Sequence, residues 1–377
     1  MSIESTERTV RPVIPKVRGD TGIRPLRRAD ISQIANLIVT YLPHVAAGNV
    51  QKVHTALDLL QSNPRYEDDS PSLVYESPSG KIEGFLGVSA RSMIFNGQRI
   101  RAAVCYDFIV DYRARNGLIP FQLLRTFFSG DQDVILSGSA GDNTRKLWQK
   151  MGGITGYLYS TYWTLPLRPL QYGLTYLNRE NRHPVLSGTG KPIARISDTL
   201  MTHFPGSPLC KKDPEGYSRQ ISGEELVGFH TKFCKHTTLR PDYTVEDLQW
   251  VLGLASKSDH LGSLECTGVF TYADDILGWF VWYSNPGGTG EVLQLHAREG
   301  KEDLVLDHLV YSAWKNGLIA LSGRVEPPMM EALGRKHCLF SPGRMWMVMH
   351  SRHQEILNVI TRGDAFLSRL EGDLWIL

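Results

Sequence analysis

The order of predicted strands and helices in the first 165 residues returns in the last third of this 377-residue chain. Both copies run through a helix, a hairpin and a third strand, and then through helix, strand, helix and strand. The first copy comprises a strand at 23–26, a helix from 31, strands at 73–76, 82–90 and 99–110, a helix from 118, a strand at 134–136, a helix at 143–151 and a strand at 157–165. The second comprises a helix at 245–255, strands at 269–272, 276–283 and 292–297, a helix at 302–314, a strand at 318–321, a helix at 327–335 and a strand at 346–350. The repeat predicts two α/β domains of one architecture, although the copies share no obvious residue identity.

Chain length and proline distribution place the boundaries between these units. On a prior of roughly 150 residues per domain, the chain has room for two domains. Between 166 and 242, prolines such as Pro184, Pro192 and Pro205 interrupt any long element, so we expect a connector with some structure. The prediction is a flexible leader over 1–22, an N-terminal domain over 23–165, the connector over 166–242 and a C-terminal domain over 243–377.

Charge and cysteine content narrow the classes of partner. With 41 Lys and Arg against 39 Asp and Glu, the formal net charge of +2 gives no broad basic field, which argues against nucleic acid or anionic membrane as the main partner. The five cysteines contain no C-x-x-C, as is typical of a reducing compartment. No apolar run approaches the ~20 residues that span a bilayer, and no signal-peptide pattern opens the chain. We expect a cytoplasmic protein with free thiols, no nucleic-acid partner and no membrane span.

The segment from Phe108 to Leu118 is the most informative candidate site. It ends a strand, turns through small and basic residues and opens a helix. A helix N-terminus presents unpaired backbone NH groups with a partial positive charge, and small residues let a phosphate approach that backbone. Arg113 and Arg115 would add bidentate donors. The segment predicts a diphosphate cradle; the alternative is an ordinary strand-to-helix loop with solvated arginines.

Two segments of the N-terminal half resemble motifs of the GNAT superfamily, the acyl-CoA-dependent N-acetyltransferases. The first motif is a strand that ends in a Val-x-Pro-x-Tyr-Arg-Gly-x-Gly-like sequence before a helix. The residues that match it or stand at its small positions are Val110, Tyr112, Arg113, Asn116 and Gly117. Asp111 and Ala114 depart from it, where the pattern has Pro and Gly. The second segment, 138–152, is similar to an Asn-led helix that ends in Tyr-x-Lys-x-Gly-Phe.

The resemblance implies an α/β (α+β) fold with two GNAT-like domains, each a mixed, splayed, mostly antiparallel sheet flanked by helices. Acetyl-CoA or another acyl-CoA would enter as co-substrate between two parallel strands that separate. Its pantetheine arm would pair with the strand that ends at Val110, and its diphosphate would rest on the turn that follows. The cofactor-binding residues implied are Phe108, Ile109, Val110, Arg113, Arg115, Asn116, Gly117, Leu118 and Asn143.

Direct acyl transfer to an amine needs a base for the ammonium and an acid for the departing thiolate. The family often supplies that acid from the Tyr of the second motif, where this chain has Trp148, which has no acidic proton at neutral pH. Either Tyr157, Tyr159 or a water takes this role, or the N-terminal half only binds. Asp107 is our candidate base, with Glu83 also on a central strand; the alternative for either is a structural ion pair or a solvated group.

The C-terminal half has a weaker loop at the matching place. His296 to Lys301 contains one glycine and an acidic residue where phosphates would lie, so we expect this copy to be degenerate. His296 and nearby aromatic residues could contribute to an acceptor pocket between the halves, or the aromatic residues fill a core. These aromatic residues are Trp279, Trp282 and Tyr283. His230, Cys234 and His236 lack a second pair that would complete a tetrahedral site, and no metal is predicted.

The sequence therefore predicts an N-acyltransferase that moves an acetyl or other acyl group from acyl-CoA to an amine of a small molecule or protein. One alternative is a catalytically silent acyl-CoA-binding or regulatory protein of the same fold. Another is a transferase for long acyl chains or acyl carrier protein thioesters. The oligomeric state stays open.

Overall fold

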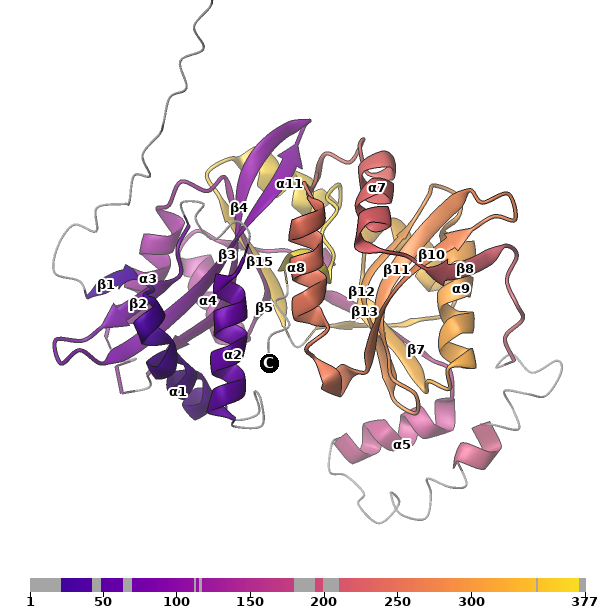
Figure 1. Cartoon of the computed structure of the whole chain (residues 1–377), viewed down its shortest axis with the longest axis horizontal. Helices are drawn as coiled ribbons and strands as arrows, with labels where there is room; N and C mark the ends of the chain where they lie inside the picture. Colours follow the sequence, from indigo (N-terminus) through magenta and orange to yellow (C-terminus); the bar gives the residue numbers. More distant parts are fainter. Residues whose placement is uncertain are drawn as a thin grey trace, which may run out of the picture.

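Two open sheets make up the molecule, one in each half (Figure 1). The structure, a computed structural model of the whole chain, describes residues 22–42, 49–63, 70–111, 113–114, 117–179, 194–198, 210–343 and 345–372. Apart from Gly22, the expected leader lies outside these ranges. Both sheets are mixed, mostly antiparallel and flanked by helices, which confirms the predicted fold class.

The first sheet is built mainly from N-terminal strands. Its order is β1-β2-β3-β4-β5-β15-β6, and β9 pairs with the far end of β3. Among these neighbours, only β4 and β5 are parallel. The strands are β1 (Ile23–Pro25), β2 (Leu73–Glu76), β3 (Ile82–Phe95), β4 (Gln98–Val110), β5 (Val134–Ala140), β6 (Ile154–Thr155), β9 (Leu239–Pro241) and β15 (Trp346–Ser351).

The second sheet repeats this arrangement. Its order is β14-β7-β13-β12-β11-β10-β8. Only β12 and β13 are parallel neighbours within it. The strands are β7 (Thr161–Pro166), β8 (Tyr217–Gln220), β10 (Ser263–Phe270), β11 (Ile276–Ser284), β12 (Thr289–Ala297), β13 (Ala320–Arg324) and β14 (Leu339–Pro342).

The two halves exchange their last strands. β7, which we expected within the N-terminal domain, pairs with β13 and β14 of the second sheet. In return, β15 pairs with β5 and β6 of the first. The buried side chain of Arg324 in β13 donates to the Gly138 carbonyl of β5 at 2.9 Å. Each sheet is thus completed by a strand from the other half. The predicted domain limits describe segments of the sequence, and they stay a prediction.

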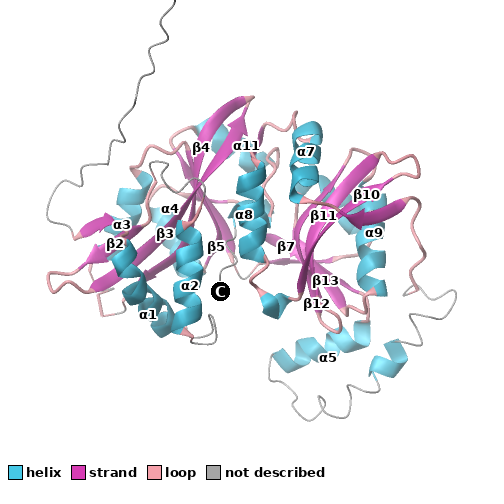
Figure 2. Ribbon diagram, in the orientation of Figure 1, coloured by secondary structure: helices cyan, strands magenta, loops and turns pink. Residues whose placement is uncertain are grey.

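Helices cover both faces of the first sheet (Figure 2). One face buries the apolar stripe of α1 and α2 against residues such as Phe85 and Ile109. The opposite face buries α3 and α4 against residues such as Leu86 and Val110. The helices are α1 (Ile31–Tyr41), α2 (Val50–Gln61), α3 (Ile119–Phe128) and α4 (Asp142–Lys150). Burial on both faces explains why the middle parts of β3 and β4, residues 84–90 and 102–106, are mostly apolar.

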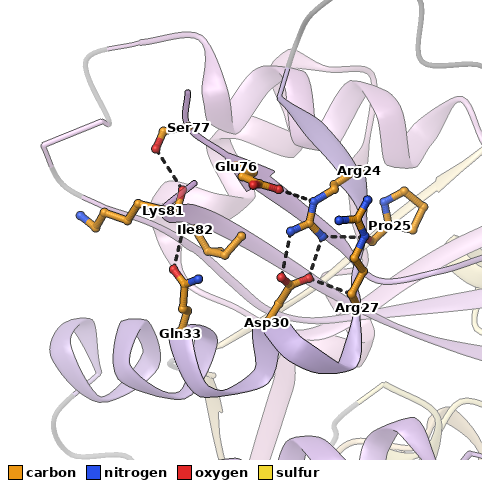
Figure 3. Close-up of polar contacts among 9 residues, drawn as sticks. All are labelled: Arg24, Pro25, Arg27, Asp30, Gln33, Glu76, Ser77, Lys81 and Ile82. Atoms are coloured by element: carbon orange, nitrogen blue, oxygen red, sulfur yellow. Dashed lines mark hydrogen bonds and ion pairs between the residues drawn. The ribbon is translucent and has the colours of Figure 1, made fainter. Parts of the chain in front are cut away.

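Arg24 ties the first strand to its neighbours (Figure 3). Its two terminal nitrogens donate to the carboxylate of Asp30 at 2.7 and 2.8 Å, and its Nε donates to Glu76 of β2 at 2.5 Å. The hydrogen bonds to Asp30 raise the pKa of Arg24 above its ordinary value. Gln33 of α1 accepts the backbone NH of Ile82 at 3.0 Å. Together these contacts fix the start of α1 to the edge of the sheet.

The expected connector contributes elements to both sheets. It holds α5 (Pro169–Arg179), β8, α7 (Gly223–Phe233) and β9. The remaining helices are α8 (Val245–Ala255), α9 (Glu302–Lys315), α10 (Met330–Arg335), α11 (Gln354–Arg362) and α12 (Arg369–Gly372). The indole of Trp250 in α8 donates to the Leu59 carbonyl of α2 at 3.1 Å, which joins the halves. In the described part of the chain, every helix is too short or too polar to cross a bilayer.

Candidate active site between strands β4 and β5

Strands β4 and β5 are paired at one end only. Their parallel register joins 102–104 to 134–136. The residues of β4 after Val104 pair with β3, and Ser137–Ala140 of β5 pair with β15. The strands therefore separate toward their carboxyl ends, as the GNAT resemblance implied. We call this opening the first wedge.

Asp107 lies at a β-bulge in the part of β4 that has left β5. The register with β3 shifts between Phe85 and Gly87, and Asp107 has a φ of 44°, a conformation that Asp and Asn tolerate better than most residues. The carboxyl group is half-buried and has no hydrogen bond or ion pair with any described residue. Burial raises its pKa to about 6. A carboxylate with that pKa is suited to accept a proton near neutral pH.

Asp111 holds the turn that follows β4. Its Oδ1 accepts the Tyr41 hydroxyl at 2.7 Å and the backbone NH of Arg113 at 2.9 Å, while its Oδ2 accepts the Lys81 ammonium at 2.8 Å. The hydrogen bond from Lys81 holds the pKa of Asp111 well below its usual range. The NH of Ala114 bonds to the Asp111 carbonyl at 3.0 Å. A phosphate at this turn would have to displace the Asp111 carboxylate from the Arg113 amide.

The other predicted cofactor-binding residues lie along the strand, the turn and two helices. Phe108 and Val110 pack on the face covered by α3, and Ile109 packs on the face covered by α1. Gly117 and Leu118 are exposed immediately before α3. Asn143 is exposed in the first turn of α4. Arg115 and Asn116 lie outside the described residues, so their roles stay a prediction.

Trp148, which stands at the family's tyrosine position, belongs to the core. It is fully buried, and its ring meets Phe128 edge-on with 4.9 Å between the ring centroids. In the described part of the chain its indole NH has no hydrogen-bond partner. The position therefore serves packing and supplies no proton donor.

The two candidate tyrosines have different surroundings. Tyr157 is 61% exposed and meets Trp346 edge-on at 6.0 Å. Trp346 in turn donates to Asp142 at the start of α4 at 2.9 Å, so Tyr157 lies close to the helix that carries Asn143. Tyr159 is fully buried, and its hydroxyl donates to the Ala365 carbonyl at 2.7 Å. Burial raises the pKa of Tyr159 above its ordinary value, so we retain only Tyr157 as a candidate acid.

Substitution of each tyrosine by phenylalanine separates these roles. Tyr159→Phe leaves the Ala365 carbonyl unpaired and is expected to lower the free energy of unfolding by about 1–3 kcal/mol. Tyr157→Phe is expected to change stability by less than about 0.5 kcal/mol and to lower acyl transfer by about 10²-fold. Urea unfolding and a free-thiol release assay measure the two effects. The assignment of Tyr157 as the acid is wrong if Tyr159→Phe lowers the rate of acyl transfer by the folded protein and Tyr157→Phe does not.

The second sheet opens in the same way. β12 and β13 pair only over 289–292 and 320–323, although β12 continues to Ala297. We call this opening the second wedge. In the loop after it, the NH of Gly300 bonds to the side chain of Glu302 at 3.1 Å, and the NH of Lys301 bonds to the Arg298 carbonyl at 2.9 Å. These amides are engaged within the loop, which favours the expectation that it holds no diphosphate.

Sequence reasoning left the aromatic residues of β11 open between a pocket and a core, and the structure places them in the core. Trp279, Trp282 and Tyr283 are all fully buried. His296 does line a pocket, together with Glu326, which the sequence analysis missed. The only local signal for Glu326 is a carboxylate between a strand and two prolines. His230 and Cys234 lie near His296, and the described residues contain no group of three or more potential metal ligands.

Known structures superpose on most of this chain. A probable N-acyltransferase from Enterococcus faecalis superposes with a TM-score of 0.56 and 9% identity, over 87% of this chain and 72% of that one. A GCN5-related N-acetyltransferase from Anabaena variabilis gives 0.56 and 11% identity, over 86% and 71%. The chain has the GNAT fold. Saccharomyces cerevisiae N-myristoyltransferase with bound myristoyl-CoA gives 0.50 and 12% identity, over 87% of this chain and 77% of that one.

At the level of sequence the chain stands apart. No family model matches it, and no curated protein matches it. The likeness to GNAT proteins is therefore one of fold, and it extends over both halves of the chain, because each of these structures covers more than four fifths of it.

Proposed function

We propose that the protein is an N-acyltransferase that binds acyl-CoA in the first wedge and transfers the acyl group to an amine of a small molecule or protein. The observation that carries this proposal is the Asp107 carboxyl, which has no partner among the described residues and belongs to the bulge of β4 where that strand has separated from β5. Buried groups with a shifted pKa at such an opening are typical of reactive sites.

The first wedge offers main-chain groups to the pantetheine arm. The end of β4 pairs with β3 on one side and has left β5 on the other. Backbone NH and C=O groups on such an edge need partners, and the amides of an extended arm can supply them as an added strand would. The thioester would then lie beside the bulge that contains Asp107.

The reaction needs three proton transfers. Asp107 takes a proton from the acceptor ammonium, the free amine attacks the thioester carbonyl and the C–N bond forms. As the C–S bond breaks, the nitrogen loses its second proton to water, and the departing CoA thiolate takes a proton from Tyr157 or from water. With a pKa of about 6, Asp107 is ionised and able to act at pH 7.

A silent acyl-CoA-binding protein is the second candidate function. Two observations favour it: Asp111 occupies the Arg113 amide of the cradle, and Trp148 replaces the family's proton donor. Isothermal titration with acetyl-, octanoyl- and myristoyl-CoA, followed by thiol release over a panel of amines, distinguishes the two. Binding with thiol release supports the transferase, whereas binding without it supports the silent protein.

Loss of the arginines at the turn should weaken acyl-CoA binding. The double variant Arg113→Ala with Arg115→Ala removes two guanidinium groups that can contact phosphate oxygens, and we expect roughly 10–100-fold weaker binding. The effect should shrink between 0.05 and 0.5 M salt because salt screens exposed charges. Arg362→Ala in the exposed last turn of α11 is the matched control. Equal affinities of the double variant and the control for acyl-CoA would show that the diphosphate binds elsewhere.

A further inference from the structure

The second wedge contains a side chain where a strand would otherwise continue. Beyond Val292, β12 no longer pairs with β13. The backbone NH of Leu295 on this open edge donates to Oε1 of Glu326 at 2.8 Å. Glu326 is the second residue after β13 and directly precedes Pro327. Its carboxyl group therefore sits inside the opening and takes the place of a main-chain partner.

A cavity of about 110 Å³ adjoins this carboxyl group. Its titratable lining groups are Glu326, Asp364 and His296, and among the described residues no Lys or Arg lines it. Pro327, Pro328 and Phe366 supply apolar wall. Carboxyl groups beside an apolar wall favour a cation that carries an apolar stem.

The two carboxyl groups that line the cavity can accept more hydrogen bonds than they form with the described residues. Within the described residues, Glu326 has the Leu295 amide as its hydrogen-bond partner, on one of its two oxygens. Asp364 is exposed and accepts the Thr238 hydroxyl at 2.5 Å. Both carboxyl groups can therefore accept further hydrogen bonds, and an ammonium group has three to donate.

His296 does not act as a cation that would pair with these carboxyl groups. Burial lowers the pKa of His296 to about 4, so its ring is neutral at pH 7. The ring lies 4.5 Å from Trp279 and 5.4 Å from Phe366, measured between centroids. It thus adds to the aromatic wall, and aromatic rings also attract cations.

We propose that the second wedge is a binding site for a primary ammonium group on an apolar stem, such as an alkylamine or a lysine side chain. The ammonium would contact Glu326, with Asp364 toward the exposed side, and its stem would lie along the prolines and Phe366. An acceptor of the proposed acyl transfer belongs to this chemical class. Binding here needs no thioester, so the inference can stand or fall separately from the acyl-CoA site.

The protonation state of Glu326 gives the proposal a signature. Burial holds the pKa of this carboxyl group well above its usual range, and the nearby charge of Arg324 opposes that shift without cancelling it. A larger share of this carboxyl group is therefore in the neutral, protonated form than for a carboxyl group in water. An arriving ammonium favours the carboxylate, so binding should release a proton to the buffer.

The test is isothermal titration of the full chain with n-butylamine hydrochloride at pH 7, in phosphate and in MOPS. We expect saturable binding, with a more exothermic signal in MOPS because that buffer takes up the released proton with more heat. 1-Butanol, the neutral analogue, should bind at least tenfold more weakly. No saturable binding of the amine, or equal binding of the alcohol, would overturn the proposal.

Three variants locate the site. Glu326→Gln keeps an acceptor for the Leu295 amide and should weaken amine binding at least tenfold and abolish the buffer dependence. Asp364→Asn, at the exposed side, should weaken it two- to threefold and covers the case in which Glu326→Gln fails to fold. Glu331→Gln, an 86% exposed carboxylate of α10, is the control and should bind as the parent does. Unchanged binding in both site variants would overturn the proposal.

Discussion

Asp107→Asn is expected to slow acyl transfer by about 10²–10⁴-fold, the range typical of a lost general base. Asn is nearly isosteric and tolerates the φ of 44° at the bulge, so the strand should keep its shape. In the parent, kcat/KM should rise about tenfold per pH unit below pH 6 and level off above it, because Asp107 must be ionised and has a pKa of about 6. The variant should lose this limb of the profile.

The same substitution is expected to stabilise the protein. Burial raises the pKa of Asp107 from 3.8 to about 6, so the unfolded chain ionises at lower pH than the folded one. Stability therefore falls as pH rises from about 4 to 6, and the full penalty, at most about 3 kcal/mol, persists above that range. Urea unfolding at pH 8 should show Asp107→Asn to be more stable than the parent.

Asp131→Asn, an exposed carboxylate in the loop before β5, is the control for both measurements. It should leave the rate unchanged and alter stability by less than about 0.5 kcal/mol. An Asp107→Asn variant that is as active as this control would remove Asp107 from the reaction.

Trp148→Ala is expected to lower the free energy of unfolding by about 3–5 kcal/mol. Trp148 is fully buried between α4 and the sheet and packs edge-on against Phe128, so truncation leaves a large cavity. Urea unfolding measures the loss. Tyr272→Ala, at a position 76% exposed, is the control and should change stability by less than about 0.5 kcal/mol.

Trp148→Tyr tests whether this position can serve as the acid. The account expects no increase in thiol release, because the side chain points into the core rather than to the site. A gain of tenfold or more would show that the position faces the thioester and that the packing role is secondary.

Local patterns in the sequence predicted elements well where the determinants lie within a few residues. The helix over 245–255 is confirmed to the residue, because Thr244 and Asp247 form a capping box at its start. The strand that ends at Val110 and the helix that follows it are also confirmed.

Strand partners could not be predicted in the same way. β7 and β15 have the patterns of ordinary strands. The alternation of polar and apolar residues along a strand indicates which of its faces is buried, but it does not indicate which sheet the strand joins. Their exchange depends on contacts between distant segments, such as the hydrogen bond from Arg324 to Gly138.

The candidate site shows the same limit. Sequence reasoning placed Asp107 on the correct strand but could not show the bulge, which is a backbone feature set by the register with β3. It treated Tyr157 and Tyr159 alike, because the Ala365 carbonyl that accepts a hydrogen bond from the Tyr159 hydroxyl lies 206 residues away in the sequence. It also could not show that the Asp111 carboxylate would accept hydrogen bonds from Tyr41 of α1 and from Lys81 of the β2–β3 turn.

A crystal structure of the full chain soaked with acetyl-CoA would show whether a CoA thioester binds between β4 and β5. We expect density for the pantetheine arm along the end of β4, with the thioester next to Asp107 and the diphosphate at the turn of Arg113. Density between β12 and β13 instead, or a first wedge that stays closed to the ligand at saturating concentration, would refute binding at β4 and β5.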